Sequence, residues 1–442
     1  MRRSLWNSHT AAAVLLCAAW QVAGATTLLE YYDKALQRDP DFAAARASFE
    51  TDIRSRELAR SAFMPSLNLS ANSDRTQYQR RDLGAPTDLG RGYDPSTLAL
   101  RLTQPVFNLE RSAYRRENEI KADRAVLVLA QARQEVALRV VRTYFNYLLA
   151  LDNLALARAQ VEALQAQVTQ LEQLLVSRSS TQTEVADARA RRELAAVQIR
   201  AAQSQLEVRK LEFTKLTGDV PSSATLPLAA NPRLLPPDPL DANAWTKAAM
   251  EGSFKVMALR AGVELADTGV ERAKAGYYPQ LNLVASRQRS RDPNYFTGME
   301  QTDNLSLQLN MNLFDGFNTR TLVEQTAAQA QKARFDLESG QQDSAIAAGQ
   351  AFWEVVNGIE QIRAMELAVA ASELALTGTR MGIKANVKTY ADELNAVQQL
   401  FSTRRDLQRE RYNYLINHAV LQSAVGGEDD AAIRTLARLI AP

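Results

Sequence analysis

The order of features in the first half of this chain returns in the second half at a nearly fixed offset. Phe352 in QAFWEVVN stands 208 positions after Tyr144 in RTYFNYLL, and Gly426 stands 208 positions after Gly218. Each half contains a helical segment, two short alternating segments and a long helix pair. A repeat of this length constrains the architecture more than any local motif, because both copies are expected to fold alike.

The start of the first alternating segment has a different offset. Pro65 in MPSLNL and Pro279 in YPQLNL are 214 positions apart, which places six extra residues in a longer loop of the first copy. The predicted division is a first repeat over 26–220, a Pro-rich linker over 221–240, a second repeat over 241–426 and a C-terminal tail over 427–442.

Residues 1–25 have the pattern of a secretory signal peptide. Arg2 and Arg3 form a basic start, AAAVLLCAAW is a short apolar core, and small residues end the segment at Ala25. The core is too short to cross a bilayer, which takes ~20 residues, and no later segment is long and apolar enough to be a membrane helix. An exported chain of this kind is soluble, surface-attached or a β-barrel.

Charge and composition exclude several classes of function. The chain has 52 Lys and Arg and 50 Asp and Glu residues, and two of the arginines belong to the signal peptide, so the remaining charges balance. A neutral chain without basic clusters has no bulk attraction to nucleic acid, and we expect no nucleic-acid partner. Beyond the signal there is no cysteine and a single histidine, His418. We therefore expect no enzyme, no cofactor and no metal site built from Cys and His.

Long helices are predicted wherever Gly and Pro are missing. Neither occurs between Val106 and Thr217, and an apolar seam there alternates three- and four-residue steps through Val161, Leu164, Val168, Leu171 and Leu175. The segment SRSSTQTE is the only plausible break. We predict a helical hairpin over about 110–217. Its first arm covers about 110–178 and is on the order of 100 Å long, and an antiparallel return arm ends at about 216. The second copy predicts a hairpin over about 318–425, with arms over about 318–381 and about 390–425.

Two pairs of strands are predicted, over about 65–107 and about 279–314, because apolar and polar residues alternate there. The apolar positions are Leu67, Leu69, Ala71, Leu98, Leu100, Leu102, Leu281, Leu283, Ala285, Leu305, Leu307, Leu309, Met311 and Leu313. A soluble amphipathic sheet packed on a helix is one interpretation. A membrane barrel, with lipid outside and water inside, is the other.

Geometry favours the barrel only if several chains build it. Two hairpins provide four strands, too few to close a barrel, and open backbone edges are not tolerated in lipid. Three chains would provide 12 strands, an even number within the bacterial range. The loops over 79–95 and 291–302 would then face outside the cell, and the long helices would extend into the periplasm.

The chain resembles the TolC family of trimeric outer-membrane export channels. The resemblance covers nearly the whole sequence after the signal and rests on the repeat, on the strand starts MPSLNL and YPQLNL, on LTQPVFN and on RYNYLIN. It implies a mostly α fold with a membrane β-barrel: a homotrimer with a 12-stranded barrel and a 12-helix periplasmic tunnel. It also implies outer-membrane lipid around the barrel, and a periplasmic adaptor and an inner-membrane ABC transporter or proton-driven pump as partners.

In this family, polar contacts around the helix turns close the periplasmic end. Alignment of the turns with the family pattern places gate and constriction candidates at Thr183, Glu184, Lys388, Asp392 and Asn395. Two positions depart from the pattern, since Asn395 replaces a second acid and Ile383 replaces a tyrosine. Arg178 and Asn386 replace turn glycines.

Each candidate has a simpler explanation that the sequence leaves open. Glu184 stands near a helix start, where an acid caps the helix and favours its dipole without any gate. Asp392 and Asn395 are spaced i and i+3, so they share one helix face, which is either solvated or lines the lumen.

Two functions within the family remain open. LALARAQ and RDLQRERYNYLIN favour the type I secretion branch, which exports proteins, and multidrug or small-molecule efflux is the alternative. A periplasmic adaptor or a coiled-coil scaffold is a third class, but an adaptor has one helical hairpin and this sequence predicts two.

Overall fold

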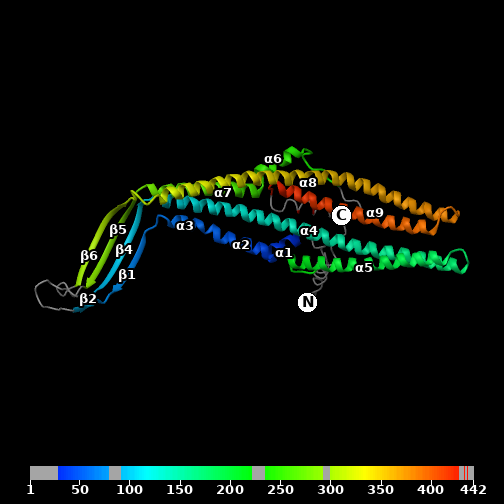
Figure 1. Cartoon of the computed structure of the whole chain (residues 1–442), viewed down its shortest axis with the longest axis horizontal. Helices are drawn as coiled ribbons and strands as arrows, with labels where there is room; N and C mark the ends of the chain where they lie inside the picture. Colours follow the sequence, from blue (N-terminus) through cyan, green and yellow to red (C-terminus); the bar gives the residue numbers. More distant parts are fainter. Residues whose placement is uncertain are drawn as a thin grey trace, which may run out of the picture. The chain divides into compact units, whose positions relative to one another are not determined.

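The computed structural model describes residues 28–78, 91–221, 234–291 and 299–427, together with 433 and 436 (Figure 1). The predicted signal peptide, most of the linker and most of the tail lie outside these residues. The shorter elements are α1 (Leu28–Arg38), α2 (Pro40–Ile53), α3 (Ser55–Ser61), β2 (Thr76–Tyr78), β3 (Arg91–Tyr93), α6 (Ala242–Gly252), α7 (Phe254–Lys274) and the 3-10 helix η1 (Ala275–Tyr277). No helix among the described residues has the length and apolar composition needed to cross a membrane.

The chain divides into two compact units, and each takes segments from both repeats. The helical unit is drawn from Met1–Ala45, Ala130–Ser253 and Asp343–Pro442, and the sheet unit from Arg46–Leu129 and Phe254–Gln342. The two sequence repeats are therefore interleaved rather than folded as separate domains.

Two helical hairpins dominate the helical unit (Figure 1). The first is α4 (Leu109–Val176) followed by α5 (Gln182–Thr217), and the second is α8 (Asn318–Lys384) followed by α9 (Tyr390–Ala424). These bounds differ by no more than three residues from those predicted. The first hairpin contains neither Gly nor Pro, and the second contains no Pro, so no helix-breaking proline interrupts either one. With 68 residues, α4 is on the order of 100 Å long.

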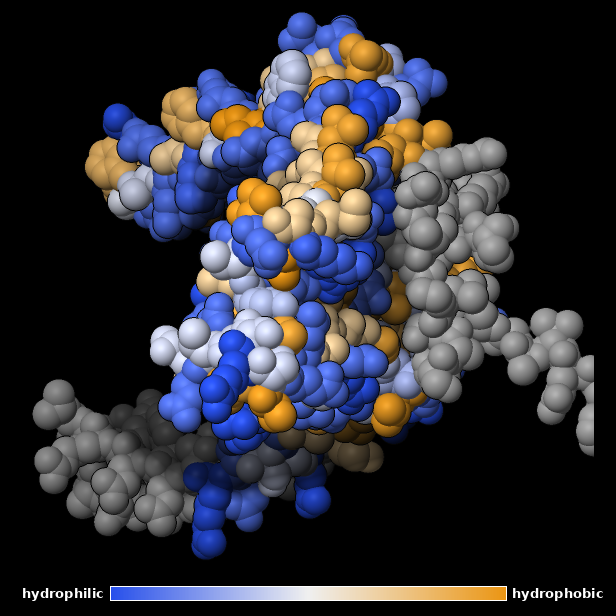
Figure 2. Space-filling view, turned by 90° about the vertical axis from the view of Figure 1, so that its right-hand side faces the viewer, coloured by the Kyte–Doolittle hydropathy of each residue, from blue (hydrophilic) through white to orange (hydrophobic). Residues whose placement is uncertain are grey.

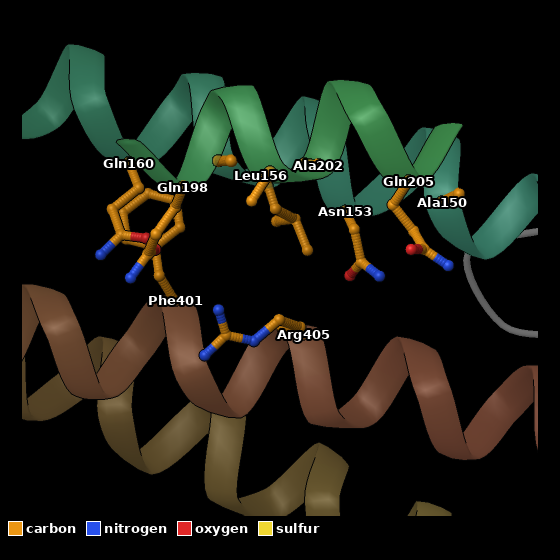
Figure 3. A pocket seen from close by; sticks show the side chains of 11 residues that line it. Ala150, Asn153, Leu156, Gln160, Gln198, Ala202, Gln205, Phe401 and Arg405 are labelled. Atoms are coloured by element: carbon orange, nitrogen blue, oxygen red, sulfur yellow. The ribbon is translucent and has the colours of Figure 1, made fainter. Parts of the chain in front are cut away.

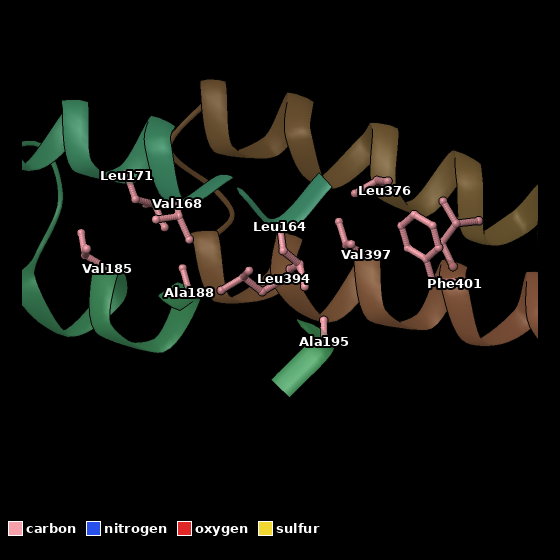
Figure 4. Close-up of a cluster of buried hydrophobic side chains, with 11 residues drawn as sticks. Leu164, Val168, Leu171, Val185, Ala188, Ala195, Leu376, Leu394, Val397 and Phe401 are labelled. Carbon is pink, nitrogen blue, oxygen red and sulfur yellow. The ribbon is translucent and has the colours of Figure 1, made fainter. Parts of the chain in front are cut away.

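The two hairpins share one apolar core (Figure 4). Its buried members come from all four helices: Leu164, Val168 and Leu171 from α4, Val185, Ala188 and Ala195 from α5, Leu376 from α8, and Leu394, Val397, Leu400 and Phe401 from α9. The predicted seam is the α4 part of this core, with Val161 and Leu175 packed at its margin. Burying these side chains holds the hairpins side by side.

A second core in the helical unit is aromatic and surrounds Tyr412 of α9. The Tyr412 ring lies 5.9 Å from that of Phe145, and its hydroxyl donates a 2.7 Å hydrogen bond to Oδ2 of Asp152 on α4. Burial raises the pKa of Tyr412 far above its usual value, so the hydroxyl stays protonated. Burial also raises the pKa of Asp152, and the hydrogen bond from Tyr412 opposes that rise.

Left-handed glycines end two segments of this unit at equivalent points of the repeat. Gly218 has φ 77° and caps α5, and Gly426 has φ 67° just after α9. A side chain at Gly426 would also collide with the carbonyl oxygen of Gly252. Both positions therefore need the conformational freedom of glycine.

The sheet unit contains a four-stranded antiparallel sheet of order β1-β4-β5-β6. Its strands are β1 (Ser66–Ser73), β4 (Ser96–Phe107), β5 (Gln280–Arg291) and β6 (Met299–Asn310). The adjoining helices α3, α4, α7 and α8 all join the strands at one end of the sheet (Figure 1). The chain is thus mostly helical with a small antiparallel sheet, as predicted.

The strand register places the leucines on one exposed face. Leu67 pairs with Leu102 and Leu69 with Leu100, while Leu283 pairs with Leu307. Leu69 is 69% exposed and Leu305 is 71% exposed. The soluble interpretation requires a helix that covers this face, and the described residues leave the face exposed.

The strand turns differ in detail from the prediction. The loop expected over 291–302 is shorter, because β5 continues through Arg291 and β6 already begins at Met299. Arg287 and Asp303, on opposing strands, form an ion pair with 2.6 Å between Nε and Oδ1. Arg287 is also opposite Leu100 of β4, so the pair lies on the same face as the leucines. In the first copy, β2 and β3 form an additional two-stranded hairpin, and residues 79–90 lie outside the described part.

Replacing Tyr412 with Phe is expected to destabilise the helical unit by about 1–3 kcal/mol, because the half-buried Asp152 carboxylate then lacks its donor. The measurement is the apparent melting temperature of the helical circular dichroism signal in detergent. Tyr147→Phe is the matched control, since the Tyr147 hydroxyl has no hydrogen bond among the described residues and its ring, 5.9 Å from that of Phe213, is kept. Equal melting temperatures for the two variants would contradict this assignment.

Candidate functional site

The turns of the two hairpins have the same backbone geometry. Arg178 and Asn386, 208 positions apart, adopt left-handed φ values of 59° and 57°. In both turns the next amide donates to the carbonyl of the residue five positions before it, from Ser179 to Leu174 and from Val387 to Gly382, each at 2.8 Å. This is a Schellman ending, which satisfies carbonyls at the helix end. The turn geometry therefore tolerates even arginine where the family pattern has glycine.

Glu184 closes a capping box at the start of α5. Its Oε2 accepts hydrogen bonds from the Thr181 backbone at 2.8 Å and from the Ser180 hydroxyl at 2.9 Å, while its own amide donates to Thr181 Oγ1 at 3.3 Å. These donors, the Thr181 amide above all, lower the pKa of Glu184. Glu184 therefore caps α5, which is the simpler explanation that the sequence left open. Its carboxylate stays charged at neutral pH.

Asp392 has the same role at the start of α9. Its Oδ2 accepts from the Thr389 amide and from the Thr389 hydroxyl, both at 2.9 Å. The pKa of Asp392 is lowered, first by the Thr389 amide, then by the hydroxyl and by the nearby Lys388 charge. The two copies differ next to the cap, where a small hydroxyl, Ser180, corresponds to the cation Lys388.

Asn395 links the two hairpins. Its Oδ1 accepts a 2.8 Å hydrogen bond from Nη1 of Arg191 on α5, and the Nε of Arg191 contacts Asp187 Oδ2 at 3.1 Å. The link joins α5, ten residues after its cap Thr181, to α9, six residues after its cap Thr389. Sequence reasoning singled out Asn395 for its departure from the family pattern and missed Arg191 and Asp187. The 204-residue separation of Arg191 and Asn395 gave no local signal.

The structure brings the five candidates to the same end of the hairpins, but not into one cluster. Thr183 and Lys388 are exposed, and no contact joins Glu184 to Asp392 in the described residues. Figure 2 shows this end with hydrophilic and hydrophobic residues interspersed. Two exposed valines, Val176 and Val387, flank the turns. The five candidates thus form two sets in one chain, one at the start of α5 and the other at the start of α9.

Each hairpin also has an internal ion pair near its turn, with the charges in the opposite order. In the first copy Glu172 of α4 meets Arg189 of α5, with 2.5 Å between Oε1 and Nη2. In the second copy Arg380 of α8, equivalent to Glu172, meets the buried Glu393 of α9 at 2.8 Å. The difference between the copies at Ser180 and Lys388 thus extends to the ion pairs near the turns.

A groove of about 290 Å³ runs between the first hairpin and α9 (Figure 3). It is lined by Ala150, Asn153, Leu156, Ala157 and Gln160 of α4, by Gln198, Ala201, Ala202 and Gln205 of α5, and by Phe401 and Arg405 of α9. Gln160 and Gln198 point toward one another above Phe401 in Figure 3. Arg405 has no acid partner among the described residues. The groove therefore offers amides and an unpaired cation over an apolar floor.

The described residues contain no group of three or more His, Cys, Asp or Glu side chains able to hold a metal ion. His418 is buried in α9, and its Nδ1 has no hydrogen-bond partner there. Burial lowers the pKa of His418, as expected for a neutral histidine in a core.

Comparisons with known proteins agree with this geometry. The family model described as outer membrane efflux protein matches residues 31–219 and 245–427. The alkaline protease secretion protein AprF of Pseudomonas aeruginosa is 30% identical over 424 residues, which cover 94% of this chain and 87% of that protein. The proteases secretion protein PrtF of Dickeya chrysanthemi is 26% identical and covers 91% and 89%.

The fold is shared with solved channels. The Campylobacter jejuni CmeC outer membrane channel superposes with a TM-score of 0.78 at 15% identity, covering 94% of this chain and 90% of that one. The relatives are named as secretion proteins and channels rather than as enzymes. The chain therefore belongs to the outer membrane efflux protein family, as its resemblance to TolC predicted, and it is an outer membrane protein.

Proposed function

We propose that this protein is a homotrimeric exit duct that spans the outer membrane and extends into the periplasm. The observation that carries this proposal is the exposed leucine face of the sheet, since lipid is the surrounding that such a face favours. β1 and β6 are the edges of the four-stranded sheet. If β6 of one chain pairs with β1 of the next chain, three chains close a barrel of 12 strands without an open edge.

The same symmetry applied to the hairpins yields a 12-helix tunnel below the barrel. Each chain contributes α4, α5, α8 and α9, and the shared apolar core already holds these four helices side by side. On the opposite face of the sheet, side chains such as Arg101 and Gln308 form a polar contact at 3.3 Å, which suits a water-filled lumen.

Type I protein secretion is the favoured export route. The names of AprF and PrtF place those proteins in protease secretion, and AprF reaches 30% identity over nearly the whole chain. Small-molecule efflux is the second candidate, favoured by the description of the family as efflux proteins. Both routes use the same duct and differ in the inner-membrane pump, an ABC transporter for secretion or a proton-driven pump for efflux.

A periplasmic adaptor is the partner that joins this duct to its pump. The groove between the first hairpin and α9 suits one helix of such an adaptor, because small residues permit close approach and the glutamines can bond to polar side chains. The unpaired Arg405 favours an acidic residue at the contacting position of the adaptor helix.

The periplasmic gate is formed by the hairpin turns. Three-fold symmetry would bring three copies of Asp392 together, and charged carboxylates close to one another attract divalent cations. The hydrogen bond between Arg191 and Asn395 is a second closing element, since it fixes the two hairpins of one chain to each other.

The export assay uses cells that lack their own duct of this family. They produce this protein together with an ABC transporter, a periplasmic adaptor and a secreted protein of a type I system, and the secreted protein is measured in the medium. We expect export with the wild type and a loss of about tenfold or more with Ala201→Trp, which fills the exposed groove. Ala159→Trp on α4, exposed but outside the groove, is the matched control.

Restored drug resistance without export of the secreted protein would replace secretion by efflux. If neither is restored, although the protein reaches the outer membrane, the duct proposal fails. Equal export by Ala201→Trp and the control would remove the groove as the adaptor site.

Replacing Asp392 with Asn should weaken block of single channels by Mg²⁺ about tenfold or more, because the volume is kept while the charge is lost. Block is recorded in planar bilayers with the cation added on the hairpin side. Because the pKa of Asp392 is lowered, the carboxylate stays charged throughout the usual pH range of Asp titration and becomes neutral only at lower pH. Block of the wild type should therefore persist as the pH falls through that range. Glu162→Gln, at an exposed acid of α4, is the control, and unchanged block in Asp392→Asn would remove Asp392 from the constriction.

A further inference from the structure

A second cleft, of about 500 Å³, lies in the sheet unit where α4 begins and α7 ends. Its lining comes from Leu109, Ser112, Ala113, Arg115, Arg116 and Glu119 of α4, from Glu271 and Lys274 of α7, and from Ala275 and Tyr278 that follow. Leu109 comes two residues after β4, and Tyr278 comes two residues before β5. The cleft therefore lies beside the end of the sheet from which the helices depart.

The cleft carries an excess of positive charge. Arg115 approaches Glu119 no closer than 3.6 Å, and Arg116 lies 3.3 Å from Glu271. Lys274 is exposed and has no ion-pair partner among the described residues. Three cations and two acids leave one unbalanced positive charge. Because both arginine pairs are exposed, either guanidinium can turn to another anion at little cost.

Exposed aromatic residues gather at the same end of the sheet. Tyr277 and Tyr278 precede β5, Phe107 ends β4, and Phe314 and Phe317 follow β6. Phe314 is 75% exposed and packs edge-on against Phe317, with ring centroids 5.4 Å apart. Aromatic side chains in this density are typical of the boundary between a membrane core and its headgroups.

We propose that this cleft binds the phosphate of an anionic glycerophospholipid whose acyl chains lie along the exposed leucine face. Arginine and lysine donate to phosphate oxygens, and basic pockets next to membrane surfaces bind lipid headgroups in this way. The position of the cleft rests on the proposed membrane placement of the sheet. A free phosphate ion shares the headgroup chemistry, but the exposed aromatic residues at the same end of the sheet and the exposed leucines of its strands favour the lipid.

The site has a function within the duct. A lipid held by both α4 and α7 bridges a helix of the first repeat and a helix of the second. The bound headgroup fixes the depth at which the sheet lies in the membrane, at the level of Arg115, Arg116 and Lys274. Aromatic residues alone also lie at the level of the headgroups, but they do not bind the phosphate of one lipid and so fix this depth less sharply.

Native mass spectrometry of the purified, delipidated oligomer tests this site. Phosphatidylglycerol is added in detergent, and the bound lipid is titrated for the wild type, Lys274→Gln and the double variant Arg115→Gln/Lys274→Gln. We expect a loss of affinity of about tenfold for the double variant, an intermediate loss for the single one, and recovery with Lys274→Arg. Lys332→Gln is the matched control, since Lys332 lies on α8 outside the cleft and is paired with Asp336.

Equal phosphatidylglycerol affinity in the wild type and the double variant would overturn the proposal. Displacement of the lipid by millimolar inorganic phosphate would also overturn it, because the site would then recognise the ion without the acyl chains. Persistence of the lipid in phosphate, together with the loss in the double variant, would support it. Absence of the wild-type oligomer would instead count against the proposed duct, and it is visible in the same spectra before lipid is added.

Discussion

The constraint on which the rest of the structure depends is the unpaired backbone at the two edges of the sheet. In the part of the chain that the structure describes, β1 and β6 each have one side without a partner strand, and the leucines of all four strands share one exposed face. In water that face would aggregate, and in lipid those edges would leave backbone donors and acceptors unsatisfied. Lipid around the leucine face, together with pairing of the two edges to other chains, removes both costs. The proposed trimer thus follows from the incompleteness of the single chain.

The helical unit must hold four long helices in a fixed register with one another, although they do not form a compact globule. The shared core of α4, α5, α8 and α9 provides the attraction, and the capping boxes of Glu184 and Asp392 fix where the return helices begin. Since both acids serve as caps, a gate built from them would use charges that the turns already require. The link from Arg191 to Asn395 does not cap either turn, which makes it the more specific element of the proposed gate.

The predictable part of the fold was local. A segment without Gly and Pro indicated the first long hairpin, the repeat indicated the second, and alternation indicated the strands, because each pattern spans many residues. The capping role of Glu184 could be foreseen from its place after Thr181. The unforeseen features join distant residues: Arg191 with Asn395, Arg380 with Glu393, and the cleft between α4 and α7. Which residues of two helices face one another depends on their relative rotation, and a single sequence carries no direct record of it.

The number of chains in the detergent-purified protein tests the central claim most directly. Native mass spectrometry or sedimentation in a density-matched detergent measures it without any assumption about cargo or pump. Closure of the sheet by β6-to-β1 pairing predicts a stable complex of three copies that resists dissociation until heated. A stable monomer that stays in solution without detergent would contradict the account, because a single chain would then tolerate both its open strand edges and its exposed leucine face.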